Sequence, residues 1–315
     1  MKLAVLFWCY KNAPICVDRV RHIRDQDPAT KIFVLFGGDV SAAPEFEQAL
    51  APYVDDFYTF DEAPPPGYAP SSTYRGGAYW KYMHGDLMWN AWYRDRGIHL
   101  EWDSVVVVQW DMLIYGAISE VFSCLKKDEM LLSGLRPIRD VEKTWLWVVG
   151  RVESQWYREF LEHVEAKFGY DQDPLCCLAI VVCLPRTFLE KYSQVEEPEK
   201  GGLEYRLPIY AQIFGTPFCR DHPFKPWWRA VEGKQYLVTL TARTREIWAP
   251  TVALNLRQRR GARVFHPYWR KTPRGFIGWT VALVDAFPRL VLSFLERLLI
   301  GERRLRLGKT RQDES

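Results

Sequence analysis

The chain has 315 residues, 48% of them hydrophobic and 26% charged, which excludes a disordered protein and allows a large buried core. Its net charge is +3, but residues 301–311 contribute +4, so the rest of the chain sums to about −1. This distribution excludes the broad basic surface of a nucleic-acid-binding protein.

The cysteines and the first apolar run indicate the cellular compartment, and the aromatic residues indicate the kind of ligand. The seven cysteines form no CxxC pair and mostly have apolar neighbours, which indicates reduced core thiols in a cytoplasmic protein. The apolar run at residues 3–9 lacks a small-residue cleavage site, so it predicts a first strand and not a signal peptide. Fourteen Trp, sixteen Tyr and seventeen Phe suit contacts to a sugar face or a nucleobase, with extra core or interface packing as the alternative.

The first half of the chain alternates predicted strands and helices. Strands are predicted at residues 2–8, 31–36 and 56–60, and helices at 14–24, 43–53 and, after a proline-rich loop, 74–96. Strands separated by helices predict an α/β fold with a mostly parallel central sheet flanked by helices.

The most informative segment is a fourth predicted strand, residues 103–111. Its four consecutive valines predict burial on both faces, and it ends in Gln109, Trp110 and Asp111. Ligands of open α/β sheets collect outside the carboxyl ends of the strands. Asp111 is therefore placed to hold a divalent cation, Mn²⁺ or Mg²⁺, which can in turn hold a diphosphate. The alternative is that Asp111 only caps the segment that follows.

Other polar side chains are expected at the same edge of the sheet. Tyr10 and Lys11 follow the first strand, and Asp39 follows the second after a glycine pair. Arg75 and Lys81 lie at the start of the helix predicted at 74–96, where a phosphate group would be favoured. Alternatively, the two glycines after Arg75 only form a turn at the start of the helix. The sequence has neither a GxGxxG after the first strand nor a P-loop, so neither of those nucleotide sites is expected.

The second half is more irregular and ends in a distinct segment. Strands are predicted at 130–133 and 178–184, and helices at 152–168 and 205–214. Residues 276–311 have an apolar face interrupted by Pro288, and a cluster of arginines follows Ile300. This pattern indicates either an interfacial membrane helix with a polybasic end or a helix packed on the core or on a second subunit.

The order of these elements resembles the GT-A-type glycosyltransferases of the nucleotide-diphospho-sugar transferase superfamily, over about residues 1–270. Their DxD motif corresponds to Gln109-Trp110-Asp111, in which an amide replaces the first acid and the third position is kept. The resemblance implies a single Rossmann-like GT-A domain at 1–270, a nucleotide-sugar donor and a divalent metal. Residues 271–315 would form a C-terminal amphipathic helix and basic tail.

The resemblance also implies an acid that acts on the acceptor and a late histidine that binds the metal. Glu204 is the candidate acid, with Asp171 and Asp173 as alternatives, and His266 is the candidate ligand. Glu204 could instead serve only the helix dipole, and a lone histidine is often structural. The acidic pair at residues 101–103 precedes its strand and is rejected. Five arginines either neutralise the leaving diphosphate or form a solvated face: Arg257, Arg259, Arg260, Arg263 and Arg270.

The sequence thus predicts a cytoplasmic glycosyltransferase in which Glu204 and Asp111 are catalytic. It would transfer a sugar from a nucleotide-sugar donor to a hydroxyl of a carbohydrate or lipid-linked acceptor, with peripheral membrane contact through 276–311. Two alternatives stay open. A nucleotidyltransferase would normally carry a glycine-rich loop after the first strand, and a non-catalytic sugar- or nucleotide-binding protein is compatible with the amide of Gln109.

Overall fold

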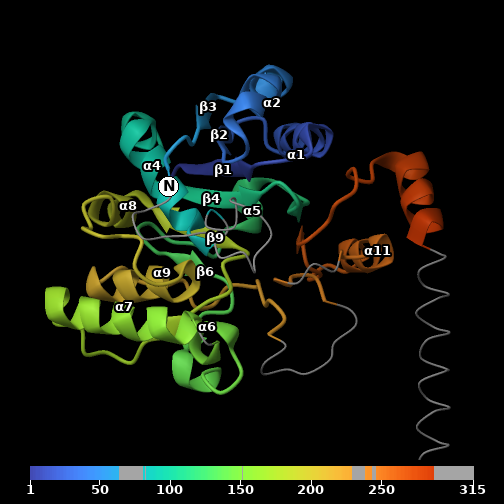
Figure 1. Ribbon diagram of the computed structural model, residues 1–315. Helices are drawn as coiled ribbons and strands as arrows, with labels where there is room; N and C mark the ends of the chain where they lie inside the picture. The colour runs from blue at the N-terminus through green and yellow to red at the C-terminus, as the bar shows by residue number, and fades with distance from the viewer. Residues whose placement is uncertain (64–80, 82, 151, 229–237, 243–245, 287–315) are drawn as a thin grey trace, which may run out of the picture. The chain divides into compact units, whose positions relative to one another are not determined.

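The chain divides into two compact units, which we call the sheet unit and the tail unit. The computed structural model describes residues 1–63, 81, 83–150, 152–228, 238–242 and 246–286 (Figure 1). The sheet unit comprises Met1–Ile247 with Ala262–Lys271, and the tail unit comprises Trp248–Gly261 with Thr272–Ser315. All residues of the candidate site described below belong to the sheet unit.

A six-stranded sheet forms the centre of the sheet unit. Its order is β3 (Asp56–Thr59), β2 (Lys31–Phe36), β1 (Leu3–Cys9), β4 (Ser104–Gln109), β9 (Val182–Pro185) and β6 (Leu131–Leu132). The first four strands pair in parallel, whereas β9 is antiparallel to both β4 and β6. The predicted α/β fold with a mostly parallel central sheet is confirmed.

Helices of the sheet unit flank this sheet (Figure 1). The helices are α1 (Ala13–Gln26), α2 (Ala43–Leu50), α4 (Gly85–Asp95), α5 (Ile118–Val121), α6 (Leu146–Val149), α7 (Glu153–Phe168), α8 (Arg186–Tyr192) and α9 (Leu203–Ile213), with α11 (Ala249–Arg257) in the tail unit. Two further strand pairs are β5 (Leu113–Ile114) with β10 (Val264–Phe265), and β7 (Arg136–Pro137) with β8 (Leu175–Cys176). Helix α7 packs on α9 through the ring of Phe160, which lies 5.5 Å from Tyr205 and 5.7 Å from Tyr210 between centroids.

Strand β4 is the buried centre that its valines predicted. It lies between β1 and β9, and Val105, Val106, Val107 and Val108 are at most 2% exposed. Because β9 is antiparallel to β4, it begins at the edge where β4 ends, with Val182 opposite Val107. The chain just before β9 is therefore brought to the carboxyl edge of the parallel strands.

Three predicted elements differ from the structure. The helix expected at 43–53 ends at Leu50 and continues as a 3₁₀ turn, Ala51–Tyr53, because Pro52 has no N–H for the next helical hydrogen bond. The strand expected at 178–184 begins only at Val182, since Ser133 binds the preceding turn through its hydroxyl, which donates to Leu178 O at 2.6 Å and accepts from Val181 N at 3.1 Å. The helix expected at 74–96 is seen as α4, and residues 74–80 and 82 lie outside the described residues.

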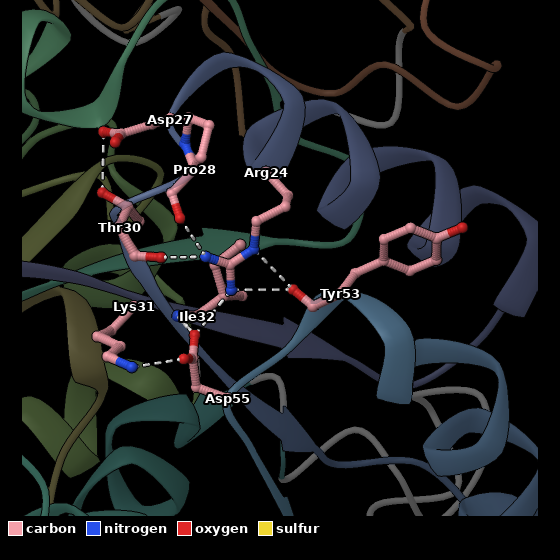
Figure 2. Close-up of polar contacts among 8 residues, drawn as sticks. All are labelled: Arg24, Asp27, Pro28, Thr30, Lys31, Ile32, Tyr53 and Asp55. Carbon is pink, nitrogen blue, oxygen red and sulfur yellow. Dashed lines mark hydrogen bonds and ion pairs between the residues drawn. The ribbon is translucent and has the colours of Figure 1, made fainter.

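At the amino edge of the parallel strands, Arg24 of α1 joins the helix to the residues just before β2 and β3 (Figure 2). Its guanidinium donates to Thr30 O at 2.7 Å, to Tyr53 O at 3.1 and 3.2 Å, and to the Asp55 carboxylate at 2.7 Å. Asp55 also accepts from Lys31 Nζ at 2.8 Å and from the Ile32 amide at 2.9 Å. Partial burial raises the pKa of Asp55, but these hydrogen bonds outweigh it, so the pKa lies below its usual value.

We expect Asp55→Asn to lower the free energy of unfolding by about 1 kcal/mol at neutral pH, because an amide brings donors toward Arg24 and the Ile32 N–H. A lowered folded-state pKa contributes stability above the unfolded value and loses it as the pH falls through the folded value. The difference between wild type and variant, measured by urea unfolding, should therefore shrink at acid pH.

Asp25→Asn is the matched control for this prediction. Asp25 pairs with Arg21 at 3.8 Å on the surface of the same helix, where both side chains are more than half exposed. Its loss should change stability by less than about 0.5 kcal/mol. Equal losses in the two variants would contradict the role given to Asp55.

Candidate active site

A pocket of about 810 Å³ opens at the carboxyl edge of β1, β2 and β4. One set of lining residues, the Asp111 group, consists of residues that follow the ends of these strands together with Lys81, before α4, and His266, after β10. Those that follow the strands are Tyr10, Lys11, Gly37, Gly38, Asp39 and Asp111. A second set, the Glu204 group, comprises Trp147, Ala179, Ile180, Leu203 and Glu204. The pocket therefore brings together all but one of the site residues that the sequence predicted. The exception is Arg75, which lies outside the described residues.

Asp111 and His266 meet because the chain from β10 runs back along the end of β4. Strand β10 pairs antiparallel with β5, which follows Asp111 directly, and the Tyr268 amide donates to Asp111 O at 2.7 Å. This pairing places His266 Nε2 3.3 Å from Asp111 Oδ1, although the two residues are 155 positions apart in the chain. Both side chains are close to nine-tenths buried.

The hydrogen bonds of this pair fit a cation site. His266 Nδ1 lies 3.0 Å from the Thr241 carbonyl oxygen, which can only accept, so Nδ1 carries the proton. When Nε2 carries no proton, it can offer its lone pair to a cation beside Asp111 Oδ1, a buried oxygen whose one close polar neighbour among the described residues is His266. A histidine whose other nitrogen donates to a backbone carbonyl is the usual arrangement of a metal ligand.

The remaining oxygen of Asp111, Oδ2, accepts from Trp269 Nε1 at 3.3 Å. Burial alone raises the pKa of Asp111, but the charge and hydrogen bond of a protonated His266 and the N–H of Trp269 outweigh it, so with that partner the pKa lies below its usual value. Within the described residues, no three acidic, histidine or cysteine side chains gather at one point. The protein would thus offer a cation two ligands here, Asp111 and His266, and leave the other positions to water and ligand.

Gln109, which stands where a DxD motif has its first acid, has a structural contact. Its side-chain N–H₂ donates to Ala179 O at 3.2 Å and so ties the end of β4 to the turn before β9. Trp110 packs edge-on against Tyr10, with the ring centroids 6.0 Å apart. The Lys11 ammonium lies over both rings, 5.2 Å from Tyr10 and 5.0 Å from Trp110. Lys11 therefore holds an exposed positive charge at the pocket without an ion pair among the described residues.

Lys81 and Asp39 are both engaged at the loop after β2. Lys81 Nζ donates to Gly37 O at 3.0 Å and Gly38 O at 3.3 Å, and burial lowers its pKa. Asp39 caps the 3₁₀ turn Val40–Ala42, and Oδ1 alone accepts from the amide and hydroxyl of Ser41. Gly38 has no room for a Cβ, which would lie 2.7 Å from Tyr10 O. Lys81 thus shapes this loop, and Asp39 keeps Oδ2 available to a ligand.

Glu204 lies in the first turn of α9 and points away from its own helix. Oε2 accepts from Trp147 Nε1 at 2.7 Å, and Oε1 accepts from the Ala179 amide at 3.3 Å. Burial raises the pKa of Glu204 to about 7, although these two hydrogen bonds oppose the rise. Both of these hydrogen bonds lead outside α9, and the place of Glu204 in the first turn also suits the helix dipole. A carboxyl group poised near neutral pH can exchange a proton with a ligand.

The two alternative acids lie elsewhere, as do the arginines of the sheet unit. Asp173 forms an exposed ion pair with Arg139 at 2.9 Å, and neither Asp173 nor Asp171 lines the pocket. Arg270 pairs with Glu246 at 3.3 Å, and neither Arg270 nor Arg263 lines the pocket. The other three arginines of the predicted cluster, Arg257, Arg259 and Arg260, belong to the tail unit.

A fully buried ion pair fixes the start of α9. Arg206 donates to both carboxylate oxygens of Asp86 on α4, at 2.8 and 2.5 Å, and to the carbonyls of Lys200 and Gly201 at 3.1 and 2.9 Å. Burial and the Arg206 charge lower the pKa of His84 to about 3, so its neutral ring accepts from Arg206 at 3.1 Å. These contacts hold the backbone from which Glu204 projects.

Sequence reasoning missed four of the five tryptophans that line the pocket, Trp110 being the one it named. Trp8, Trp89, Trp147 and Trp269 were not assigned to the site, and all four line it. Trp269 could have been found, because it follows His266 by three positions. Trp147 lies in an irregular segment without a periodic signal, so only the fold places it next to Glu204.

No family model and no curated protein matches the chain. Three solved structures are similar to it in part. The galactosyltransferase LgtC, in complex with donor and acceptor sugar analogs, is 14% identical with a TM-score of 0.40, over 68% of this chain and 72% of that one. The apo bifunctional glycosyltransferase WbbM is 10% identical with a TM-score of 0.33, over 68% and 38%. Apo mouse xyloside xylosyltransferase 1 is 11% identical with a TM-score of 0.34, over 69% and 84%. All three are glycosyltransferases.

Proposed function

We propose that the protein is a glycosyltransferase that moves a sugar from a nucleotide-sugar donor to an acceptor hydroxyl with the help of a divalent metal. The observation that carries this proposal is that one pocket holds both a buried carboxylate–imidazole pair, Asp111 and His266, and a carboxyl group with a pKa of about 7, Glu204. The Asp111–His266 pair suits binding of a metal–diphosphate complex, and Glu204 suits the role of proton acceptor.

The donor would bind to the Asp111 group. Asp111 and His266 would hold Mn²⁺ or Mg²⁺, and the free oxygen of Asp39 would accept from a ribose hydroxyl. Lys11 is the described cation best placed for a phosphate, since Lys81 already donates to two carbonyls. A bound divalent cation supplies charge that offsets the negative charge developing on the leaving diphosphate.

The acceptor would bind to the Glu204 group. In an inverting reaction Glu204 accepts the proton of the acceptor hydroxyl while its oxygen forms a bond to the anomeric carbon. The bond from that carbon to the diphosphate oxygen breaks, and its electron pair leaves on the nucleoside diphosphate. Turnover distinguishes this function from that of a non-catalytic binding protein with the same pocket.

We expect Asp111→Asn to abolish the stabilisation of the protein by Mn²⁺ together with a nucleotide-sugar. A donor at about 100 times its dissociation constant should stabilise the wild type by about 2.7 kcal/mol, visible as a thermal shift when UDP-, GDP-, CMP- and dTDP-sugars are screened. Asp173→Asn, which alters an acid outside the pocket, should keep the full shift. An Asp111→Asn protein that binds metal and donor as wild type would remove the basis of the proposed donor site.

We expect Glu204→Gln to lower the rate of transfer at least a hundredfold while donor affinity stays within about twofold, because the amide keeps the size but cannot take a proton. In the wild type, Glu204 is protonated below its pKa of about 7, so kcat should fall about tenfold per pH unit below that value. A kcat that is flat between pH 5.5 and 8, or loss of donor binding in the variant, would contradict the assignment.

The tail unit would add contact with a membrane surface. Residues 275–286 are helical, and Phe276, Ile277, Val281 and Val284 are 86, 78, 57 and 65% exposed. The expected bend at Pro288 and the arginine cluster lie outside the described residues. Among the helices that the structure describes, none has the length and apolar character needed to cross a bilayer. An apolar helix face followed in sequence by a segment of charge +4 suits an anionic lipid surface.

We expect the full chain to co-sediment with anionic vesicles, and Phe276→Ser with Ile277→Ser to reduce the bound fraction severalfold, because both side chains would leave the lipid interface. Binding should also weaken as salt is raised. Ile98→Ser, at an exposed isoleucine of the sheet unit, is the control. Retention of binding in the double variant would place the lipid contact elsewhere in the chain, and a full chain that does not bind vesicles would argue for a helix that packs on protein.

A further inference from the structure

The Glu204 group is apolar except for its acid and one indole N–H. Ala179, Ile180 and Leu203 have no polar side-chain atom, and the only polar atom of Trp147, Nε1, already donates to Glu204. The Asp111 group, by contrast, carries charged and polar side chains. A ligand at Glu204 therefore meets mostly hydrocarbon, with the amide of Gln109, which donates to Ala179 O, at the border of this wall.

This apolar character continues outward along α6. Trp147 lies on this short helix, where Trp145 is only 7% exposed and Val148 packs against the core. The other side of the segment is open, with Leu146 58%, Val149 51% and Val152 50% exposed. Three exposed aliphatic residues within seven positions thus flank the tryptophan that contacts Glu204. We call Leu146, Val149 and Val152 the α6 ridge.

We infer that the acceptor is an amphipathic molecule whose reactive hydroxyl group is joined to an alkyl or isoprenoid-like chain. The hydroxyl group would reach Glu204, and the chain would pack on Trp147 and the α6 ridge. This inference rests on the proposed function for the role of Glu204, but the chain-binding surface can be tested without turnover.

A hydrocarbon chain suits this wall better than a free oligosaccharide, because the chain has no hydrogen bonds to satisfy. A free oligosaccharide would bring several hydroxyl groups to a wall where only Glu204 and the bordering Gln109 offer side-chain partners, and each buried, unpaired hydroxyl group is costly. An alkyl chain loses no hydrogen bond there and gains from leaving water. Continuity from Trp147, which lines the pocket, to its neighbours on α6 indicates where such a chain would leave the site.

The test compares n-octyl β-D-glucoside, below its micelle-forming concentration, with methyl β-D-glucoside by isothermal titration calorimetry on the full-length protein. We expect the octyl compound to bind at least tenfold more tightly, which burial of about two methylene groups would supply. Leu146→Ser with Val149→Ser should reduce this preference at least fivefold. Both residues are exposed, so the double variant should fold.

Ile98→Ser is the matched control, because Ile98 is 49% exposed and lies beside the amino edge of β4. It should keep the full preference for the octyl compound. Equal affinity for the two glucosides, or equal losses in the control and the double variant, would overturn the inference. The Mn²⁺-dependent thermal shift with nucleotide-sugars, run in parallel, keeps the two claims apart, since it reports the donor site and does not depend on the α6 ridge.

Discussion

The buried pair of Arg206 and Asp86 is the interaction on which the Glu204 half of the site depends. Both side chains are fully enclosed, and the guanidinium meets the carboxylate with two parallel hydrogen bonds. Tyr192 of α8 donates to the same carboxylate at 2.6 Å, so α4, α8 and α9 meet at one point. Burial alone lowers the pKa of Arg206, but Asp86 outweighs it and raises the pKa, which keeps the charge in place. Removing one partner of such a pair typically costs about 3–5 kcal/mol, because the other charge is left uncompensated.

The two halves of the pocket are built in different ways. The Asp111 group follows from the parallel sheet, whose strands end at one edge and present the residues that come next. The Glu204 group follows from the antiparallel strand β9, which starts at that edge, and from Arg206, which fixes the beginning of α9. The backbone of Ala179 contacts both halves of the pocket, because its carbonyl oxygen accepts from Gln109 and its amide donates to Glu204. A single backbone turn thus couples the end of β4 to the acid opposite.

Glu204 shows how environment gives an ordinary residue its chemical character. A glutamate in the first turn of a helix normally serves the helix dipole and stays charged at neutral pH. Here the carboxyl group is partly exposed at the pocket and bonded to Trp147 and Ala179, and the surrounding protein raises its pKa to about 7. The hydrogen bond from Trp147 favours the charged form, so the indole and the apolar wall act in opposite directions on the same equilibrium.

The sequence by itself determined the order of strands and helices in the first half and the buried position of β4, because valine runs and apolar periodicity are local signals. It also indicated Tyr10, Lys11, Asp39 and Asp111 as neighbours, since parallel strands must end at a common edge. Tertiary structure alone decided that His266 lies against Asp111, through pairing of β10 with β5 across 155 positions, and that Trp147 contacts Glu204. It also gave Gln109 and Lys81 structural contacts. The physical reason is that side-chain partners and burial depend on which distant segments pack together, and no local pattern encodes that choice.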